Sequence, residues 1–94
     1  MSNMNVEQIF NACNNLGRGL ESLIEKKCNG EQVKIDVRQD GTADDLTITF
    51  ALSNKRDPQG EVSPRAVEYI EKKLPQYVGD AFQNTTFKVV AKPK

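Results

Sequence analysis

The sequence contains no histidine and no tryptophan, and aromatic residues make up only 6% of its 94 residues. Without histidine, the chain lacks the usual general base of nucleophilic catalysis and the commonest transition-metal ligand of proteins. Carboxylates cluster at Asp40, Asp44 and Asp45, but their order does not match a calcium loop. We therefore predict no catalytic residue, no metal site and no bound cofactor.

The chain also has no excess of charge of either sign, because 13 lysines and arginines balance 13 acidic residues. It thus has no net attraction for phosphate backbones or anionic membranes. No apolar run approaches the ~20 residues of a membrane span, and the segment MSNMNVEQIF lacks the basic and apolar regions of a secretory signal. We expect a cytoplasmic protein, in the host cytoplasm if a phage encodes it.

Only two cysteines are present, Cys13 and Cys28. On one continuous helix, fifteen residues correspond to ~22 Å of axial rise, too far for a disulfide bond. Cys13 falls on an apolar stripe, which predicts a buried thiol, whereas Cys28 at the helix end is expected to be partly exposed.

Apolar residues recur with helical spacing over residues 5–28 and again over 64–82. Asn5 is a predicted N-cap with Gln8 in the capping-box position, and residues 28–30 predict the C-terminal stop.

The second helix is predicted to begin after Ser63, an N-cap residue, with Pro64 in the first helical position. Its apolar spacing continues through Pro75, so we expect this helix to be kinked or divided there.

Alternating apolar and polar residues predict strands over 33–38, 46–53 and 85–91. The first two form a predicted hairpin. Asp40 and Gly41 supply its turn chemistry, in a loop that looks longer than two residues.

Together these patterns predict one small domain over residues 1–94, with flexible ends at 1–4 and 93–94 and an exposed loop at 54–62. The fold class is α+β, a two-layer sandwich in the order α-β-β-α-β. Both helices cover one face of a three-stranded mixed sheet. The third strand should run parallel to the second, but the sequence leaves open whether it pairs with the first or the second strand.

This element order resembles that of type II KH-like and BolA-like domains. A KH domain would carry a GxxG loop, and BolA-like proteins a functional histidine. Neither occurs in this sequence, so no site residue is implied by the resemblance.

Because the sequence has no catalytic constellation, we interpret the protein as a non-catalytic binding module that occupies the surface of a macromolecular partner, and we expect that partner to be a protein. It would act as an inhibitor, adaptor or assembly subunit, and accessory proteins of phages or mobile elements often have this character. One alternative is a nucleic-acid-binding domain of KH-like topology. Another is a small enzyme or ligand-binding subunit.

Three surfaces are candidates for partner binding, and an open sheet edge also makes a homodimer plausible. The loop is one, and the uncovered sheet face with its scattered basic residues is another. The third is the first helix, where the stretch NNLGRGLES keeps helical phase but places two glycines in a helix interior. We expect the helix to contact the second helix closely at Gly17, and to contact a partner or a symmetry-related copy of the chain at Gly19. The candidate residues are Asn54, Lys55, Arg56, Asp57 and Gln59 in the loop; Lys34, Arg38, Lys88 and Lys92 on the sheet; and Asn15, Gly17, Arg18 and Gly19 on the helix.

Overall fold

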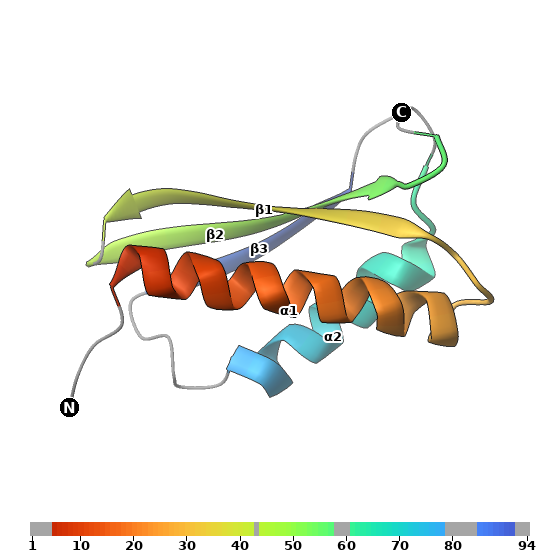
Figure 1. Cartoon of the computed structure of the whole chain (residues 1–94), viewed down its shortest axis with the longest axis horizontal. Coiled ribbons are helices and arrows are strands. Elements are labelled where there is room, and N and C mark those ends of the chain that lie inside the picture. The colour runs from red at the N-terminus through yellow and green to blue at the C-terminus, as the bar shows by residue number, and fades with distance from the viewer. Residues whose placement is uncertain (1–4, 43, 58–60, 79–84, 92–94) are drawn as a thin grey trace.

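The computed structural model describes residues 5–42, 44–57, 61–78 and 85–91. It confirms the predicted α+β fold and its order α-β-β-α-β. Both helices lie on the same side of the sheet (Figure 1). The elements are α1 (Val6–Lys27), β1 (Val33–Thr42), β2 (Asp45–Asn54), α2 (Pro64–Val78) and β3 (Thr85–Ala91). The predicted flexible ends and residues 79–82 of the predicted second helix lie outside the described residues.

Local capping chemistry sets both ends of α1. The Asn5 side chain accepts a hydrogen bond from the Gln8 amide at 2.8 Å, and the Gln8 side chain accepts one from the Asn5 amide at 3.0 Å. At the other end, Asn29 has a left-handed φ of 56°, and the Gly30 amide donates to the Glu25 carbonyl at 2.9 Å. This is the Schellman pattern of a helix stop, so the predicted capping box and C-terminal stop are both confirmed.

The start of α2 is also as predicted. The Ser63 hydroxyl accepts a hydrogen bond from the Ala66 amide at 3.2 Å, and Pro64 is the first helical residue. The helix then continues through Pro75 to Val78 without a division. Of the two expected alternatives, a kinked or a divided helix, this excludes the divided one, and the kink stays a prediction. A proline removes one backbone hydrogen bond from a helix. Ile70 and Leu74, in the turn before Pro75, are buried in the core, and this packing offsets part of that loss.

The sheet has the order β1-β2-β3, with β2 in the centre. β1 pairs with β2 in antiparallel fashion, and β3 pairs with β2 in parallel, as predicted for strands that a helix connects. The question that the sequence left open is thus settled, because the third strand lies beside the second.

The hairpin between β1 and β2 is tighter than expected. Thr42 pairs with Asp45, which leaves only residues 43 and 44 between the strands, so the prediction of a longer loop is wrong. Asp40 and Gly41 lie within β1 and not in the turn. Gly41 has a φ of 102°, and a Cβ atom there would lie 2.1 Å from the Asp45 carbonyl oxygen. This position therefore requires glycine, because another residue would be both strained and in collision with the turn.

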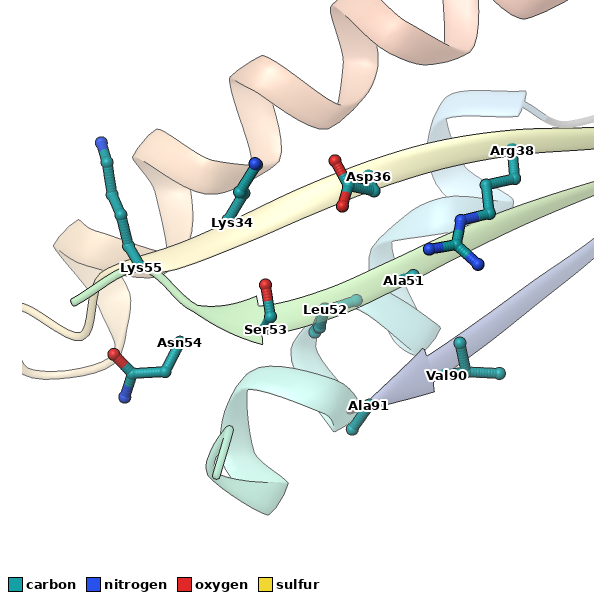
Figure 2. A pocket seen from close by; sticks show the side chains of 10 residues that line it. All are labelled: Lys34, Asp36, Arg38, Ala51, Leu52, Ser53, Asn54, Lys55, Val90 and Ala91. Atoms are coloured by element: carbon teal, nitrogen blue, oxygen red, sulfur yellow. The ribbon is translucent and has the colours of Figure 1, made fainter. Parts of the chain in front are cut away.

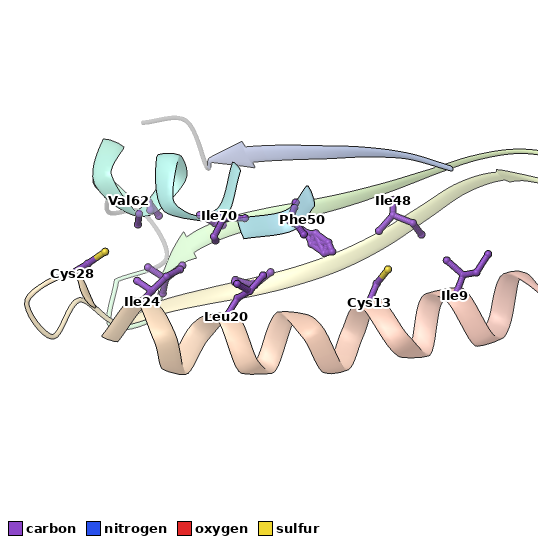
Figure 3. Packing of buried hydrophobic residues seen from close by; sticks show 14 of the residues in the cluster. Ile9, Cys13, Leu20, Ile24, Cys28, Ile48, Phe50, Val62 and Ile70 are labelled. Atoms are coloured by element: carbon purple, nitrogen blue, oxygen red, sulfur yellow. The ribbon is translucent and has the colours of Figure 1, made fainter. Parts of the chain in front are cut away.

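The core fills the single layer between the helices and the sheet (Figure 3). Phe50 of β2 lies in its middle and stacks on Phe87 of β3, with ring centroids 6.3 Å apart. The alternation that predicted the strands is the alternation that the structure buries. The buried apolar residues are Ile9, Cys13, Leu20, Ile24, Cys28, Val33, Ile35, Leu46, Ile48, Phe50, Leu52, Val62, Ala66, Ile70 and Leu74.

Gly17 makes the close contact that the helical phase suggested, but with a different element. A Cβ atom on Gly17 would lie 3.3 Å from Val37 Cγ2 and 3.5 Å from Ile35 Cγ2, both on β1. The expected contact with the second helix is therefore wrong. The helix backbone approaches the strand here because glycine presents no side chain.

The two cysteines are free thiols, and both are buried. Cys13 is 1% exposed, as predicted, but Cys28 is only 4% exposed, so the expectation of a partly exposed thiol is wrong. Cys28 is the C-cap residue of α1, where the chain turns back toward β1. The turn folds its side chain into the core instead of leaving it at the surface.

Candidate functional site

The face of the sheet that the helices leave uncovered carries the polar half of each alternating strand. Along β1 the side chains of Lys34, Asp36 and Arg38 are exposed, and along β3 those of Thr86, Lys88 and Val90. We call this surface the outer face. It is the counterpart of the buried layer, because neighbouring residues of a strand point to opposite sides of a sheet.

The strand register arranges the outer face in rows that run across the sheet. Asp36 pairs with Ala51, which pairs with Val90, and this middle row is made of small or apolar side chains apart from Asp36. One flanking row joins Lys34 to Ser53. The other flanking row joins Arg38, Thr49 and Lys88. Basic side chains thus stand on both sides of a largely uncharged row.

A shallow hollow of about 480 Å³ lies over these rows at the Asn54 end of the sheet. Figure 2 shows Lys34 and Lys55 toward one end of the hollow, and Arg38 beside Val90 toward the other. Its lining comes from all three strands, and it consists of Lys34, Asp36, Arg38, Ala51, Leu52, Ser53, Asn54, Lys55, Val90 and Ala91.

The charged groups of the hollow are not engaged with the rest of the described chain. No side-chain hydrogen bond or ion pair among the described residues involves Lys34, Arg38 or Lys55. Asp36 is the single acidic residue in the lining, against these three basic ones. The hollow therefore carries a local positive excess on a molecule with no net charge, and its cations are free to contact an anionic partner.

Val90 gives the hollow an apolar contact point. It is 44% exposed, and it is the one large apolar side chain that is exposed in the described part of the chain. Ala51 and Ala91 beside it are small. The floor of the hollow can thus accept an apolar group between the basic side chains.

The loop after β2 is attached at both ends to the residues that precede β1. The Lys55 amide donates to the Gln32 carbonyl at 3.1 Å, and Arg56 Nε donates to Gln32 Oε1 at 3.0 Å. At the far end, Glu31 accepts from the Ser63 amide at 3.0 Å and from the Ser63 hydroxyl at 2.6 Å. These contacts fix where the loop leaves the sheet, and so hold Lys55 at the rim of the hollow.

The predicted loop residues therefore divide into two groups. Asn54 and Lys55 line the hollow. Arg56 and Asp57 do not, and the Asn54 side chain accepts hydrogen bonds from their amides at 2.9 and 3.1 Å. Gln59 lies outside the described residues.

Two of the four predicted sheet residues line the hollow. Lys34 and Arg38 line the hollow, and Lys88 lies in the same row as Arg38 on the far strand. Lys92 lies outside the described residues. Asp36, Ala51 and Val90 also line the hollow, although they were not among the candidates from the sequence. Their alternation placed them on this face, but only the register makes them neighbours.

The candidate residues of α1 do not join this site. Arg18 donates to the Ile35 carbonyl and pairs with Glu21 at 3.1 Å, while Glu21 accepts from the Ile35 amide at 2.7 Å. These two side chains occupy the outward hydrogen-bonding groups of β1 at Ile35, and so block strand pairing there. Gly17 is buried, whereas Asn15 and Gly19 are exposed. A Cβ atom on Gly19 would meet nothing within 4 Å.

A second cavity, of about 430 Å³, lies where α1 ends and α2 begins. It is lined by Cys28, Asn29, Glu31, Ser63, Pro64 and Arg65. Burial raises the pKa of the Cys28 thiol, nearby Glu31 raises it further and Arg65 lowers it. The net effect favours the protonated thiol, which is the less reactive form, and Glu31 already occupies the amide and hydroxyl of Ser63.

In the described ranges of residues, no group of three histidine, cysteine or acidic side chains could hold a metal ion, and no polar or charged side chain is buried. No helix in these ranges is long and apolar enough to cross a membrane.

Comparison with protein-family models, curated proteins and solved structures finds no match to this chain.

Proposed function

We propose that this protein is a non-catalytic binding module that engages a protein partner through the outer face of its sheet. The observation that carries the proposal is the hollow over β1, β2 and β3, which Lys34, Arg38 and Lys55 line together with an exposed Val90. Protein interfaces have an apolar centre and a polar rim. Charged side chains without partners in the described chain, together with an exposed apolar side chain, resemble this arrangement on a small scale. As an inhibitor, adaptor or assembly subunit, the protein would act by covering a surface of its partner.

A protein partner is favoured over a nucleic acid by what the hollow contains. Its lining has no aromatic side chain, and single-stranded nucleic acids are bound largely by stacking on aromatic residues. A duplex is bound mainly through many phosphate contacts, whereas this hollow offers three cations and one opposing carboxylate.

The proposal is tested by capturing partners with the tagged protein from cells that encode it, and by repeating the capture with charge-reversed variants. The site variant is Lys34→Glu with Arg38→Glu. The control is Lys26→Glu with Lys72→Glu, which makes the same change of charge at exposed positions on α1 and α2. Circular dichroism and thermal unfolding establish that both variants fold.

The expected result is a protein that the wild type and the control both capture, that the site variant captures at least about tenfold less, and that survives nuclease treatment. Purified, this protein should bind directly in calorimetry. Equal capture by the site variant would overturn the outer face as the binding surface. Loss of the partner after nuclease treatment would favour the nucleic-acid alternative.

A further inference from the structure

The spacing of the basic side chains on the outer face indicates which kind of protein segment it could bind. Lys34 and Arg38 stand four residues apart on β1, with Asp36 between them. Four residues of a strand span about 14 Å, and residues at even spacing point to the same face. The basic rows are therefore about 14 Å apart, and the row of Asp36, Ala51 and Val90 lies midway between them.

An extended peptide has the same repeat as the strands beneath it. Its residues i, i+2 and i+4 point to one side and also span about 14 Å. Carboxylates at i and i+4 would thus reach the two basic rows together. The residue at i+2 would lie over the middle row, where Val90 and Ala51 accept an aliphatic side chain. Its backbone groups would remain in the shallow, solvent-open part of the hollow.

From this match we infer that the hollow binds an extended acidic segment of the partner, with carboxylates four residues apart and an aliphatic residue midway. The inference rests on the proposed function and deepens it by naming the chemistry of the segment. Lys55 at the rim, held by Gln32, extends the basic row of Lys34 and would contact a further carboxylate beyond position i.

The probe for the test is a nine-residue peptide, acetylated and amidated at its ends. Two glutamates stand four residues apart, with an isoleucine midway and serine and glycine elsewhere. A second peptide of identical composition has its glutamates three residues apart, which directs them to opposite sides of an extended chain. A third has glutamine in place of both glutamates. Binding is followed by NMR titration of the labelled full-length protein at low salt.

The expected result is that the first peptide shifts the amides of residues 34–38, 49–53 and 88–91. It should bind at least about threefold more tightly than either control peptide, the size of effect that a single solvent-exposed ion pair gives. Arg38→Ala and Val90→Ser should each weaken binding about threefold, and Asp36→Asn should strengthen it about twofold by removing repulsion. Lys72→Ala on α2 is the matched control and should change nothing.

Equal binding of the two glutamate peptides would overturn the inferred spacing. Tighter binding of oligothymidylate than of the first peptide, at the same amides, would overturn an acidic protein segment as the occupant. These outcomes are separate from the fate of the proposed function. If the peptide fails while a protein partner is still lost with the Lys34→Glu and Arg38→Glu variant, the binding module stands and only the acidic segment is refuted.

Discussion

The two faces of β2 are formed by alternating residues of one strand, yet they differ in burial and in polarity. Leu46, Ile48, Phe50 and Leu52 are at most 1% exposed, whereas Thr47, Thr49, Ala51 and Ser53 alternate with them and remain partly accessible. The inner face is covered by two helices and contributes to the free energy of folding through buried apolar area. The outer face has no such cover in the described chain, so its side chains are available for another molecule. The inner side of this strand thus contributes to stability, and the outer side is the one to which we attribute binding in the proposed function.

The largest difference in stability is expected between variants that truncate one side chain on each face. Phe50→Ala removes a fully buried ring that stacks on Phe87, and should lower the free energy of unfolding by about 3 to 5 kcal/mol. Thr49→Ala, one residue away on the outer face, should change it by less than about 0.5 kcal/mol. Urea denaturation of both variants measures the difference. Similar losses for the two would contradict the assignment of the faces.

The second effect concerns Cys13, a titratable side chain in the buried layer. Burial raises the pKa of the Cys13 thiol from 9.0 to about 11. The unfolded chain loses this proton above pH 9 while the folded chain retains it, so the thiol's contribution to stability is complete below pH 9 and is lost as the pH rises toward 11. The loss should approach about 2 kcal/mol.

Urea denaturation between pH 8 and pH 11 tests this contribution. Cys13→Ala lacks the thiol, so its free energy of unfolding should fall less steeply over that range than that of the wild type. The comparison is between slopes, because the smaller side chain also lowers stability at every pH. Parallel curves would show that Cys13 does not titrate as inferred.

A smaller effect is expected at the edge of β1, where the two faces meet. Glu21→Ala leaves the buried Ile35 amide without its acceptor, and should lower the free energy of unfolding by about 1 to 2 kcal/mol. Glu21→Gln keeps an acceptor and should lose less. Because the outward amide of Ile35 becomes available for pairing while Arg18 still occupies the carbonyl, light scattering should also detect some self-association of the alanine variant. Equal stability of the two variants would argue that the hydrogen bond is unimportant.

The smallest expected effect distinguishes the buried from the exposed glycine of α1. Gly19→Ala places a methyl group in open space and should raise the free energy of unfolding by about 0.5 to 1 kcal/mol through helix propensity. Gly17→Ala gains the same propensity but brings its Cβ to 3.3 Å from Val37 Cγ2, so it should gain less or lose stability. Thermal unfolding compares the two. Equal gains would show that the approach of α1 to β1 is not tight.

Much of the fold could be predicted from local patterns, because each pattern is a local physical requirement. Asn5 and Gln8 form a capping box with neighbours three residues away, and the alternation over 46–53 needs only a pleated strand with one buried side. The predictions that failed depended on contacts distant in the sequence. Cys28 is buried because the chain folds back over it, and the exact turn between Thr42 and Asp45 follows from strand pairing.

The candidate site shows the same division. The sequence by itself determined that Lys34, Arg38 and Lys88 share the polar side of their strands, because side-chain direction alternates with every residue. Only the tertiary structure decided that β3 lies beside β2, which brings Val90 next to Ala51 and places both between two basic rows. It also decided that Arg18 binds the edge of β1. Periodicity is a property of consecutive residues, whereas register and edge contacts arise only when separate elements pack.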